Sequence, residues 1–430
     1  MKKSTYLNII TGESEYLLHN TLYNTILKAK CEVTKSIVNA LQENSFVYTD
    51  ENEFHVALRD LKMIVDDDLD ELALLDSIVS RINRDTLEIV LIVTSQCNFR
   101  CVYCYEKFSN NAMDGEFYSK LIDAIEYEVV NKGYKGILLS FFGGEPMLEY
   151  ESIISFMKEI KLLAQKLDIK VTGAMTTNAY LLSKEKLAQL VNLDVKNYQI
   201  TVDGLEESHN ASRFLVSGAG TWSKIISNLK DAKESELDFN ITIRTNFDAD
   251  LAHDFNGYIE LMSDYFSNDT RFTYYFESVK KLGGDSDDKI KVVENEATAI
   301  DDFSSLAVKH NLQVVRFGTT PFSGICYAAK SSSLVIDTAG NILKCTVLLE
   351  SPDNKVGELQ DGRFDVSGEM IDKWTAYELP QGCHDCRILP ICYARACPPS
   401  NLHVCGADSD YCHNLVMTYN NVMKAKYPLL

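Results

Sequence analysis

Between residues 87 and 279 the chain alternates short hydrophobic runs with longer amphipathic segments. The short runs are rich in β-branched and aromatic residues and end at turn formers, which predicts strands. In the longer segments hydrophobic residues recur every three or four positions, which predicts helices with one apolar face. The predicted strands read LEIVLIVT, GILLSFF, VTGAMTT, NYQITVD, FNITIRTNF and RFTYYFESV, and the predicted helices include EFYSKLIDAIEYEVV, YESIISFMKEIKLLAQKL and SKEKLAQLV.

This alternation predicts an α/β fold in which parallel strands are joined by right-handed crossovers. Six such units fit either an open doubly wound sheet or an incomplete barrel. In both architectures ligands bind in the loops that follow the carboxyl ends of the strands. Functional residues are therefore expected in those loops.

The first predicted strand runs directly into SQCNFRCVYC, which places Cys97, Cys101 and Cys104 within eight positions. Three thiolates on one short loop can hold three irons of a 4Fe-4S cluster and leave the fourth iron open to a small-molecule chelate. Zinc is the alternative, but a structural zinc site closes with four ligands. No fourth cysteine or histidine lies close in the sequence, so a distant residue such as Cys31 would have to complete a zinc site. Without that role, Cys31 is expected to be a buried helix residue.

The second predicted strand ends in GGEP, Gly143 to Pro146, at the corresponding edge of the sheet. Two adjacent glycines let the backbone turn and approach a ligand closely, and Glu145 offers an acceptor for a ligand amine. Alone, this tetrapeptide fits a plain tight turn before a helix. Because it lies one unit after a cysteine loop, it indicates a binding site.

Composition limits the setting of this chemistry. The chain has 430 residues, enough for two or three domains, and a formal net charge of −20. Such a charge opposes phosphate backbones and anionic lipids, so neither nucleic acid nor a membrane is expected as a partner. No apolar stretch has the length of a membrane span and the first residues lack a signal-peptide core, which predicts a cytoplasmic protein. In that reducing compartment the cysteines are expected to be metal ligands or catalytic groups.

The C-terminal region holds eight more cysteines, the number that two four-cysteine sites require. SSLVIDTAGNILKC predicts a hairpin with Gly340 in its turn, and CHDCRILPIC presents a CxxC pair with a third thiol close behind. Spacing alone does not separate two zinc modules from two iron–sulfur clusters. The eight are Cys326, Cys345, Cys383, Cys386, Cys392, Cys397, Cys405 and Cys412.

CNFRCVYC resembles the CxxxCxxC signature of the radical S-adenosylmethionine (SAM) superfamily, with Tyr103 as the aromatic residue before the third cysteine. GGEP resembles the glycine-rich motif of that superfamily, which holds the amino group of SAM. TTNAYLL resembles TNGxLL, with Ala179 where glycine is common, and ITVDG resembles the SLDG segment. The resemblance covers about residues 88 to 280 and implies a partial (β/α)6 barrel.

The resemblance also implies cofactors and their contacts. Cys97, Cys101 and Cys104 would hold a 4Fe-4S cluster whose open iron binds SAM, while Thr201 and Arg213 would contact the carboxylate and ribose region of SAM. Without the resemblance, an ordinary strand residue and a surface ion pair would be the simpler interpretations of those two. The implied SAM contacts are Tyr103, Gly143, Gly144, Glu145, Asn178, Thr201 and Arg213.

The order of the C-terminal cysteines resembles the SPASM extension, which carries auxiliary 4Fe-4S clusters in peptide-modifying enzymes, so the resemblance implies three clusters in all. CYARAC departs from the common pattern, because four residues separate its cysteines where three are usual. Cys405 would supply the fourth ligand of the inner cluster, or that iron would be open to bind the substrate. By position, Cys383, Cys386, Cys392 and Cys412 would bind the outer cluster, and Cys326, Cys345 and Cys397 the inner one.

Three domains are expected: residues 1–86, a radical SAM core over 87–310, and a SPASM domain over 311–430. In the first, YLNIITGESEYLLHNTLYNTILKAKCEVTKSIVNAL predicts a hairpin followed by a helix, with further helices up to SIVSRI. This loosely resembles the winged-helix-like domains that recognise leader peptides along a strand edge. A plain helical cap over the barrel is the alternative.

Taken together, the resemblances imply a radical SAM oxidoreductase that acts on a ribosomally synthesised precursor peptide, as sactipeptide and ranthipeptide maturases do. The product would carry a thioether, carbon–carbon or carbon–oxygen crosslink, and a flavodoxin or ferredoxin would donate electrons. One alternative is an anaerobic sulfatase-maturating enzyme, which forms formylglycine. Another is a non-catalytic zinc or iron–sulfur scaffold.

Overall fold

The computed structural model describes residues 1–249, 255–282, 287–315, 321–322, 325–375, 379, 381–393, 416–417, 419–424, 427 and 429. The chain divides into two compact units. Unit 1 comprises Met1–Asn83, Arg316–Lys330 and Trp374–Leu430, and unit 2 comprises Arg84–Val315 and Ser331–Lys373.

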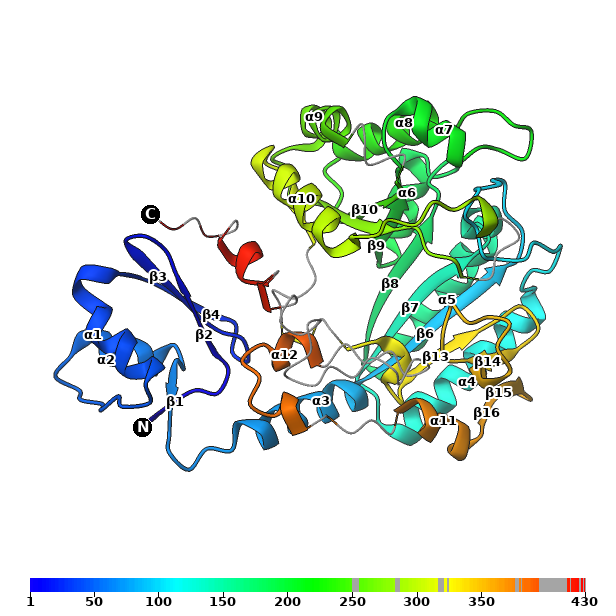
Figure 1. The fold of residues 1–430 in the computed structure, drawn as a ribbon. Coiled ribbons are helices and arrows are strands. Elements are labelled where there is room, and N and C mark those ends of the chain that lie inside the picture. Colours follow the sequence, from blue (N-terminus) through cyan, green and yellow to red (C-terminus); the bar gives the residue numbers. More distant parts are fainter. Residues whose placement is uncertain are drawn as a thin grey trace. The chain divides into compact units, whose positions relative to one another are not determined.

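Unit 2 is built on one long sheet, with β6 to β11 at its centre (Figure 1). These strands lie in sequence order and each is parallel to the next, which confirms the predicted α/β fold with a parallel sheet. A doubly wound sheet reverses its strand order at a switch point, whereas this unbroken order is that of a barrel segment. The strands match the six predicted runs: β6 Thr86–Thr94, β7 Gly136–Gly143, β8 Lys170–Thr177, β9 Val195–Thr201, β10 Asn240–Phe247 and β11 Phe272–Ser278.

Short strands extend this sheet at both edges. On one side β12 (Gln313–Val314) pairs with β11, and on the other β13 (Ser333–Ile336) pairs in parallel with β6. Antiparallel strands β14 (Asn341–Leu343), β15 (Lys355–Gln360) and β16 (Arg363–Val366) follow β13. The predicted hairpin is thus β13–β14, and Gly340 in its turn has a φ of +85°, which glycine adopts without strain.

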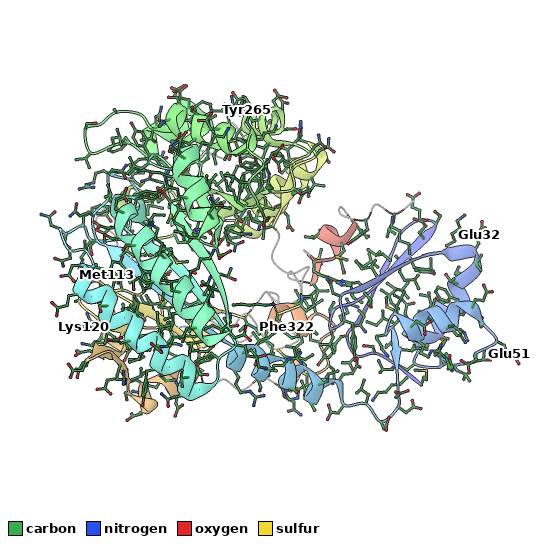
Figure 2. The ribbon with its side chains drawn as sticks, turned by 180° about the vertical axis from the view of Figure 1, so that it is seen from behind. Glu32, Glu51, Met113, Lys120, Tyr265 and Phe322 are labelled. Carbon is green, nitrogen blue, oxygen red and sulfur yellow. The ribbon has the colours of Figure 1, made fainter. Side chains whose placement is uncertain are left out.

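Helices connect the strands of unit 2, and α4 shows how the sequence specifies them. The Asp114 side chain caps its first turn by accepting from the Phe117 amide at 2.8 Å, and Gly133 ends it with a φ of +69°. Leu121 lies on its buried face, while Lys120 lies on its outer side (Figure 2). The helices are α4 Gly115–Lys132, α5 Tyr150–Leu167, α6 Lys184–Asn192, α7 Glu206–Ser212, α8 Trp222–Lys233, α9 Phe255–Phe266, α10 Glu296–Lys309 and α11 Gly368–Thr375.

Strands β9 to β11 bury every second side chain in the main core. Phe276 on β11 contacts Phe255 of α9 with ring centroids 5.2 Å apart, and Phe247 on β10 contacts Phe303 of α10 at 4.8 Å. Since successive side chains of a strand point to opposite faces, the residues between these belong to the other face of the sheet. That other face carries Arg244 and Glu277.

The first part of unit 1 is a three-stranded antiparallel sheet followed by helices. Leu18 from the sheet, Val38 from the first helix and Leu58 from the second share one apolar cluster. The predicted hairpin and helix are present, and β4 adds a third strand. The elements are β2 Leu7–Thr11, β3 Glu15–Asn20, β4 Thr25–Lys30, α1 Cys31–Gln42, α2 Glu53–Asp60 and α3 Glu71–Asp85, with a small sheet of β1 Lys2–Lys3 and β5 Ile64–Val65.

Segments from the C-terminal end of the chain pack onto this first part of unit 1. The Thr21 hydroxyl donates to the Arg387 carbonyl at 2.6 Å, and the Asn8 side-chain amide donates to the Asn420 Oδ1 atom at 2.9 Å. Ile10 and Leu17 also share an apolar cluster with Cys392 of α12, Leu389–Cys392. Within the described ranges, no helix is long and apolar enough to cross a bilayer.

Candidate active site

A pocket of about 500 Å³ lies at the carboxyl ends of the central strands in unit 2. The loop after β6 forms one side, and the last residues of β7 to β11 form the rest. All ten residues predicted for the first cluster and for SAM line this one pocket. They are Cys97, Cys101, Tyr103, Cys104, Gly143, Gly144, Glu145, Asn178, Thr201 and Arg213.

The cysteine loop is fixed by backbone hydrogen bonds to the segment that follows α7. The Arg100 amide donates to the Phe214 carbonyl at 2.9 Å, and the Val102 amide donates to the Ser212 carbonyl at 3.0 Å. Phe99 anchors the loop in the core and is 1% exposed. The three neighbouring thiols are half-buried and line the pocket. The backbone of the loop is thus fixed by hydrogen bonds, and its sulfur atoms face the cavity.

Burial determines the charge of these thiols. Burial first, and then nearby carboxylates, raise the pKa of Cys97 and of Cys104 to about 12. The pKa of Cys101 is also raised, again chiefly by burial. A bound cation reverses this effect, because it stabilises the thiolate form. Within the described residues, no three His, Cys, Asp or Glu side chains are already grouped as a formed metal site. The donor type nevertheless fits an iron–sulfur cluster.

Gly143 and Gly144 bring the end of β7 against the start of the cysteine loop. The Gly144 amide donates to the Thr94 carbonyl at 3.0 Å, and the Glu145 amide donates to the Gln96 carbonyl at 2.8 Å. A Cβ atom on Gly144 would lie 2.1 Å from the Gln96 carbonyl oxygen. Gly143 has a φ of +129°, which other residues rarely adopt. The close approach that these glycines allow is therefore an approach to the cysteine loop.

The carboxylate of Glu145 is buried and already accepts three hydrogen bonds. The donors are the Thr177 hydroxyl at 2.6 Å, the Asn178 amide at 2.7 Å and the Met147 amide at 2.9 Å. Burial raises the pKa of Glu145, and these three bonds oppose the rise. A carboxylate has about four lone-pair sites, so one remains for a ligand amine.

Arg213 is held by a buried polar network that sequence reasoning missed. Its Nη1 atom donates to the Tyr103 hydroxyl at 2.9 Å, and that hydroxyl donates to Asp203. The Asn246 backbone amide donates to the other Asp203 oxygen at 2.8 Å. Tyr103 therefore acts through its hydroxyl on Arg213. The Nε atom of Arg213 is buried and has no hydrogen-bond partner in the described part of the chain, which fits a site that an anionic group completes.

A histidine supports the same network from behind. His209 accepts from the Asp203 amide at 3.1 Å and contacts the Thr221 hydroxyl at 3.1 Å, and that hydroxyl donates to the Arg213 carbonyl at 2.7 Å. Burial first, and then the Arg213 charge, hold the pKa of His209 well below its ordinary value. The sequence signal for Asp203 was its place in ITVDG, directly after a strand, but His209 had none.

Two further positions add to the description of the pocket. Ala179 has a φ of +60°, so it adopts the left-handed conformation that glycine takes more easily at the place where the resemblance noted a glycine. Glu106 also lines the pocket, although no motif predicted it. Burial first, and then the Glu145 charge, raise the pKa of Glu106 to about 8. This carboxyl is therefore mainly protonated at neutral pH.

The C-terminal cysteines are partly described. In unit 1, Cys383 and Cys386 share a tight turn in which the Cys386 amide donates to the Cys383 carbonyl at 3.0 Å, and Cys392 ends α12. In unit 2, Cys345 follows β14, and its backbone amide donates to the Asn354 Oδ1 atom at 2.8 Å. Their predicted ligand sets stay predictions. Cys326 precedes the turn Tyr327–Ala329, Cys31 begins α1, and Cys397, Cys405 and Cys412 lie outside the described residues.

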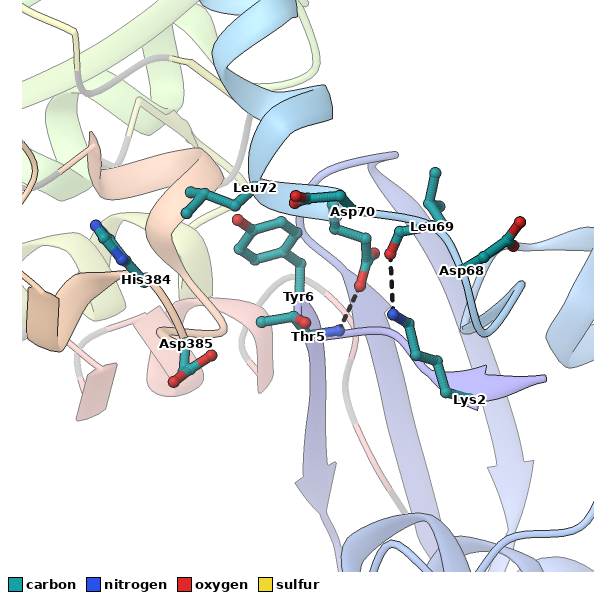
Figure 3. A pocket seen from close by; sticks show the side chains of 10 residues that line it. Lys2, Thr5, Tyr6, Asp68, Leu69, Asp70, Leu72, His384 and Asp385 are labelled. Carbon is teal, nitrogen blue, oxygen red and sulfur yellow. Dashed lines mark hydrogen bonds between the residues drawn. The ribbon is translucent and has the colours of Figure 1, made fainter.

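A second cavity, of about 330 Å³, lies in unit 1 (Figure 3). Glu71 accepts from the Thr5 amide at 2.7 Å at its edge, and the Lys2 ammonium donates to the Leu69 carbonyl at 2.9 Å. Asp70 and Asp385 give it an acidic character. None of the predicted site residues lines it.

Comparisons with known proteins agree with this geometry. Residues 91–254 match the Radical SAM superfamily. A cysteine-type anaerobic sulfatase-maturating enzyme of Clostridium novyi is 22% identical over 70% of this chain and 84% of its own length. A GTP 3',8-cyclase of Clostridium perfringens is 23% identical over 67% of this chain and 89% of its own length. The radical SAM cyclopropyl synthase TigE of Paramaledivibacter caminithermalis is 23% identical over 59% and 61%.

Two solved structures share the fold. Native anSMEcpe with bound AdoMet and Cp18Cys peptide superposes with a TM-score of 0.56 and 16% identity, over 80% of this chain and 97% of that one. Streptococcus suis SuiB bound to the precursor peptide SuiA superposes with a TM-score of 0.52 and 13% identity, over 93% and 96%. At such low identities these structures show the fold alone.

Proposed function

Since residues 91–254 form a radical SAM domain, we propose that this chain is a radical SAM enzyme that crosslinks a ribosomally synthesised precursor peptide. One observation carries the proposal. The three cysteines of CNFRCVYC share a single pocket with all seven predicted SAM contacts, although these residues span more than a hundred positions of the sequence. A random set of buried residues would not converge in this way.

Different residues of the chain would bind the cluster and orient SAM. Cys97, Cys101 and Cys104 would hold the cluster, which when reduced supplies the electron that cleaves SAM to methionine and a 5'-deoxyadenosyl radical. Arg213 offers a fixed positive charge, and its Nε atom is a free donor for the SAM carboxylate. Glu145 keeps one acceptor site for the SAM amine. These groups are buried or half-buried, which limits their own contact with water.

The first test is SAM cleavage itself. The protein is reconstituted anaerobically with iron and sulfide, then incubated with SAM and dithionite, and 5'-deoxyadenosine is measured by chromatography. Reconstituted wild type should form 5'-deoxyadenosine in the absence of any peptide. Uptake of stoichiometric zinc without iron, and no 5'-deoxyadenosine, would contradict the proposal.

Several observations support a peptide substrate. Both solved neighbours have a peptide bound, and the SuiB likeness extends over 93% of this chain, far beyond residues 91–254. Unit 1 supplies a three-stranded sheet whose edge strands are β2 and β4. Of these, β4 is less buried, so a leader segment would pair with β4 as a fourth strand. The plain-cap alternative predicts no leader affinity.

The peptide proposal is tested with a small cysteine-containing precursor encoded beside this protein. It is incubated with the reconstituted enzyme, SAM and reductant, and the product is fragmented by mass spectrometry. Loss of two hydrogens per link with retention of sulfur indicates a thioether, carbon–carbon or carbon–oxygen crosslink, and the fragments identify the bond. A matched precursor without its leader should bind more weakly. Equal binding of both forms would refute the leader site.

Formylglycine formation is the second candidate, because the Clostridium novyi sulfatase-maturating relative aligns with 70% of this chain. The same incubation with a cysteine-containing sulfatase-type peptide separates the two. Replacement of the cysteine sulfur by an aldehyde oxygen would favour formylglycine. Auxiliary clusters bound by the C-terminal cysteines, and electron supply by a flavodoxin or ferredoxin, belong to both proposals and would be measured as iron content and as reductase-dependent turnover.

A further inference from the structure

Part of the pocket is lined by residues that were not predicted to contact the cluster or SAM. The ends of β9, β10 and β11 form it, and Gln199, Arg244, Asn246, Glu277 and Lys280 line it. All these residues belong to unit 2. Their chemistry is polar and charged, in contrast to the apolar face of the same strands that packs on α9 and α10.

This polar face is unusual for the centre of a parallel sheet. Such sheets are normally covered on both faces, so that their strands read as almost continuous hydrophobic runs. In β10 the buried Ile241 and Ile243 alternate instead with the half-buried Thr242 and Arg244. The inner face of these strands is therefore built to contact a polar ligand.

Arg244 lies at the middle of this face and its side chain is fixed in place. It pairs in register with Thr201 on β9 and with Tyr275 on β11. Its Nε atom donates to the Asn246 Oδ1 atom at 2.7 Å, and its guanidinium carbon lies 5.8 Å from the centre of the Tyr275 ring. Fixing the guanidinium before a ligand arrives lowers the entropy cost of binding.

The two terminal nitrogens of Arg244 are unused. Across the described ranges, they make no hydrogen bond and no ion pair, although Arg244 lines the pocket. Among the described residues, Glu277 accepts from the Lys280 ammonium at 2.8 Å and from the Tyr275 hydroxyl, and it forms no hydrogen bond or ion pair with Arg244. Lys280 in turn lies 3.1 Å from Glu296. The two terminal nitrogens of Arg244 can thus donate to a group that enters the pocket.

We infer that Arg244 binds a carboxylate of the substrate, so that the peptide segment to be modified presents an aspartate or glutamate side chain beside the reacting residue. This inference rests on the proposed peptide-modifying function and names a property of its substrate. A guanidinium with both terminal nitrogens free matches the two oxygens of a carboxylate. Arg213 differs because the Tyr103 hydroxyl already accepts from it. The Asn246 side chain links the two arginines, because it accepts from the Arg244 Nε atom at 2.7 Å and donates to the Tyr103 hydroxyl at 3.1 Å.

The test compares two synthetic peptides, acetyl-Gly-Glu-Cys-Gly-amide and its glutamine counterpart, on the reconstituted, SAM-loaded enzyme. Wild type should bind the glutamate peptide about tenfold more tightly, as expected for one charge-assisted bidentate contact. In Arg244→Gln this preference should fall below about twofold, and Arg244→Lys should keep part of it. Arg363→Gln, an arginine of β16 stacked on Tyr127, is the matched control and should keep the full preference.

Each other outcome overturns the inference. Equal binding of the two peptides by wild type, no binding of either, or a preference that persists in Arg244→Gln would each show that Arg244 does not recognise a substrate carboxylate. A rise in the SAM dissociation constant of Arg244→Gln of tenfold or more would assign Arg244 to the cofactor instead. If wild type cleaves SAM in any of these cases, only the inference fails. If wild type does not cleave SAM, the proposed function fails.

Discussion

Two of the cysteine-bearing regions in this chain are built on opposite principles. Cys97, Cys101 and Cys104 are half-buried on a loop whose backbone is fixed and whose thiols face a pocket of about 500 Å³. Cys383 and Cys392 are only 6% and 7% exposed and lie in apolar clusters of unit 1. The first region leaves room for a second molecule beside its sulfur atoms, whereas the second is covered by the chain itself.

This difference teaches how one residue type can serve two purposes. Thiols on a fixed loop at the end of a parallel strand can hold a metal group and still admit a ligand from the cavity side. Thiols packed among apolar side chains can bind only a group that the fold encloses, so their loss is expected to affect stability more than chemistry. The variants below separate these effects.

Replacing Cys97, Cys101 and Cys104 together by alanine should have the largest effect on chemistry. 5'-Deoxyadenosine formation should fall below detection, because no other site would bind SAM beside a cluster. If three clusters are present, about four of about twelve irons should be lost and the others retained. Chromatography and iron analysis of the same sample check both expectations. SAM cleavage by the triple variant would contradict the assignment.

Replacing Cys383 and Cys392 by alanine should give the converse result. Loss of an enclosed metal group belongs to the few changes that cost more than about 4 kcal/mol of unfolding free energy. Thermal unfolding, followed by circular dichroism, should therefore have its midpoint at a lower temperature than in wild type. Peptide-independent SAM cleavage at low temperature should persist. An unchanged transition together with unchanged iron content would remove the contrast between the two regions.

Gly144→Ala tests the packing of the open region. The added Cβ atom would lie 2.1 Å from the Gln96 carbonyl oxygen, so the cysteine loop or the end of β7 must shift. A displacement of this size at a reacting site can cost about a hundredfold in rate. Gly115→Ala, where nothing lies within 4 Å of the new atom, is the matched control. Equal rates of 5'-deoxyadenosine formation in both variants would show that the close approach is not needed.

Tyr103→Phe should have the smallest effect of this series. It removes the hydroxyl that joins Arg213 to Asp203 but leaves the cysteine ligands in place. The dissociation constant of SAM should rise about tenfold with unchanged iron content, since a hydrogen bond to a charged group contributes about 1.5 kcal/mol. Tyr198→Phe, whose buried hydroxyl donates to the Val195 carbonyl, is the control. A parallel change in both variants would indicate a general loss of structure.

Local patterns in the sequence predicted much of unit 2. The strand runs predicted β6 to β11 to within two residues at each end, because each run is continuous along the chain, but they left a doubly wound sheet and a barrel open. The motifs predicted ten of the residues that line the pocket, since the carboxyl ends of sequential parallel strands meet at one edge. Ala179 illustrates the precision of this reasoning, because its φ of +60° occurs where a glycine is usual.

Long-range contacts explain what the sequence did not reveal. The N-terminal sheet packs against the α12 segment in unit 1 through contacts such as the hydrogen bond between Thr21 and Arg387. These two residues are 366 positions apart in the sequence. The role of Tyr103 as a support for Arg213 also depends on the distant Asp203. The free terminal nitrogens of Arg244 depend on which neighbours are already engaged, and no motif encodes that.

The central claim is that the cysteine loop of residues 97–104 forms an open site where SAM binds. Electron paramagnetic resonance of the dithionite-reduced, reconstituted protein, recorded with and without SAM, tests it most directly. SAM should change the signal of one cluster in wild type, and should change nothing in the variant that lacks Cys97, Cys101 and Cys104. A signal in wild type that SAM leaves unchanged, or one that SAM still alters in the triple variant, would contradict the account.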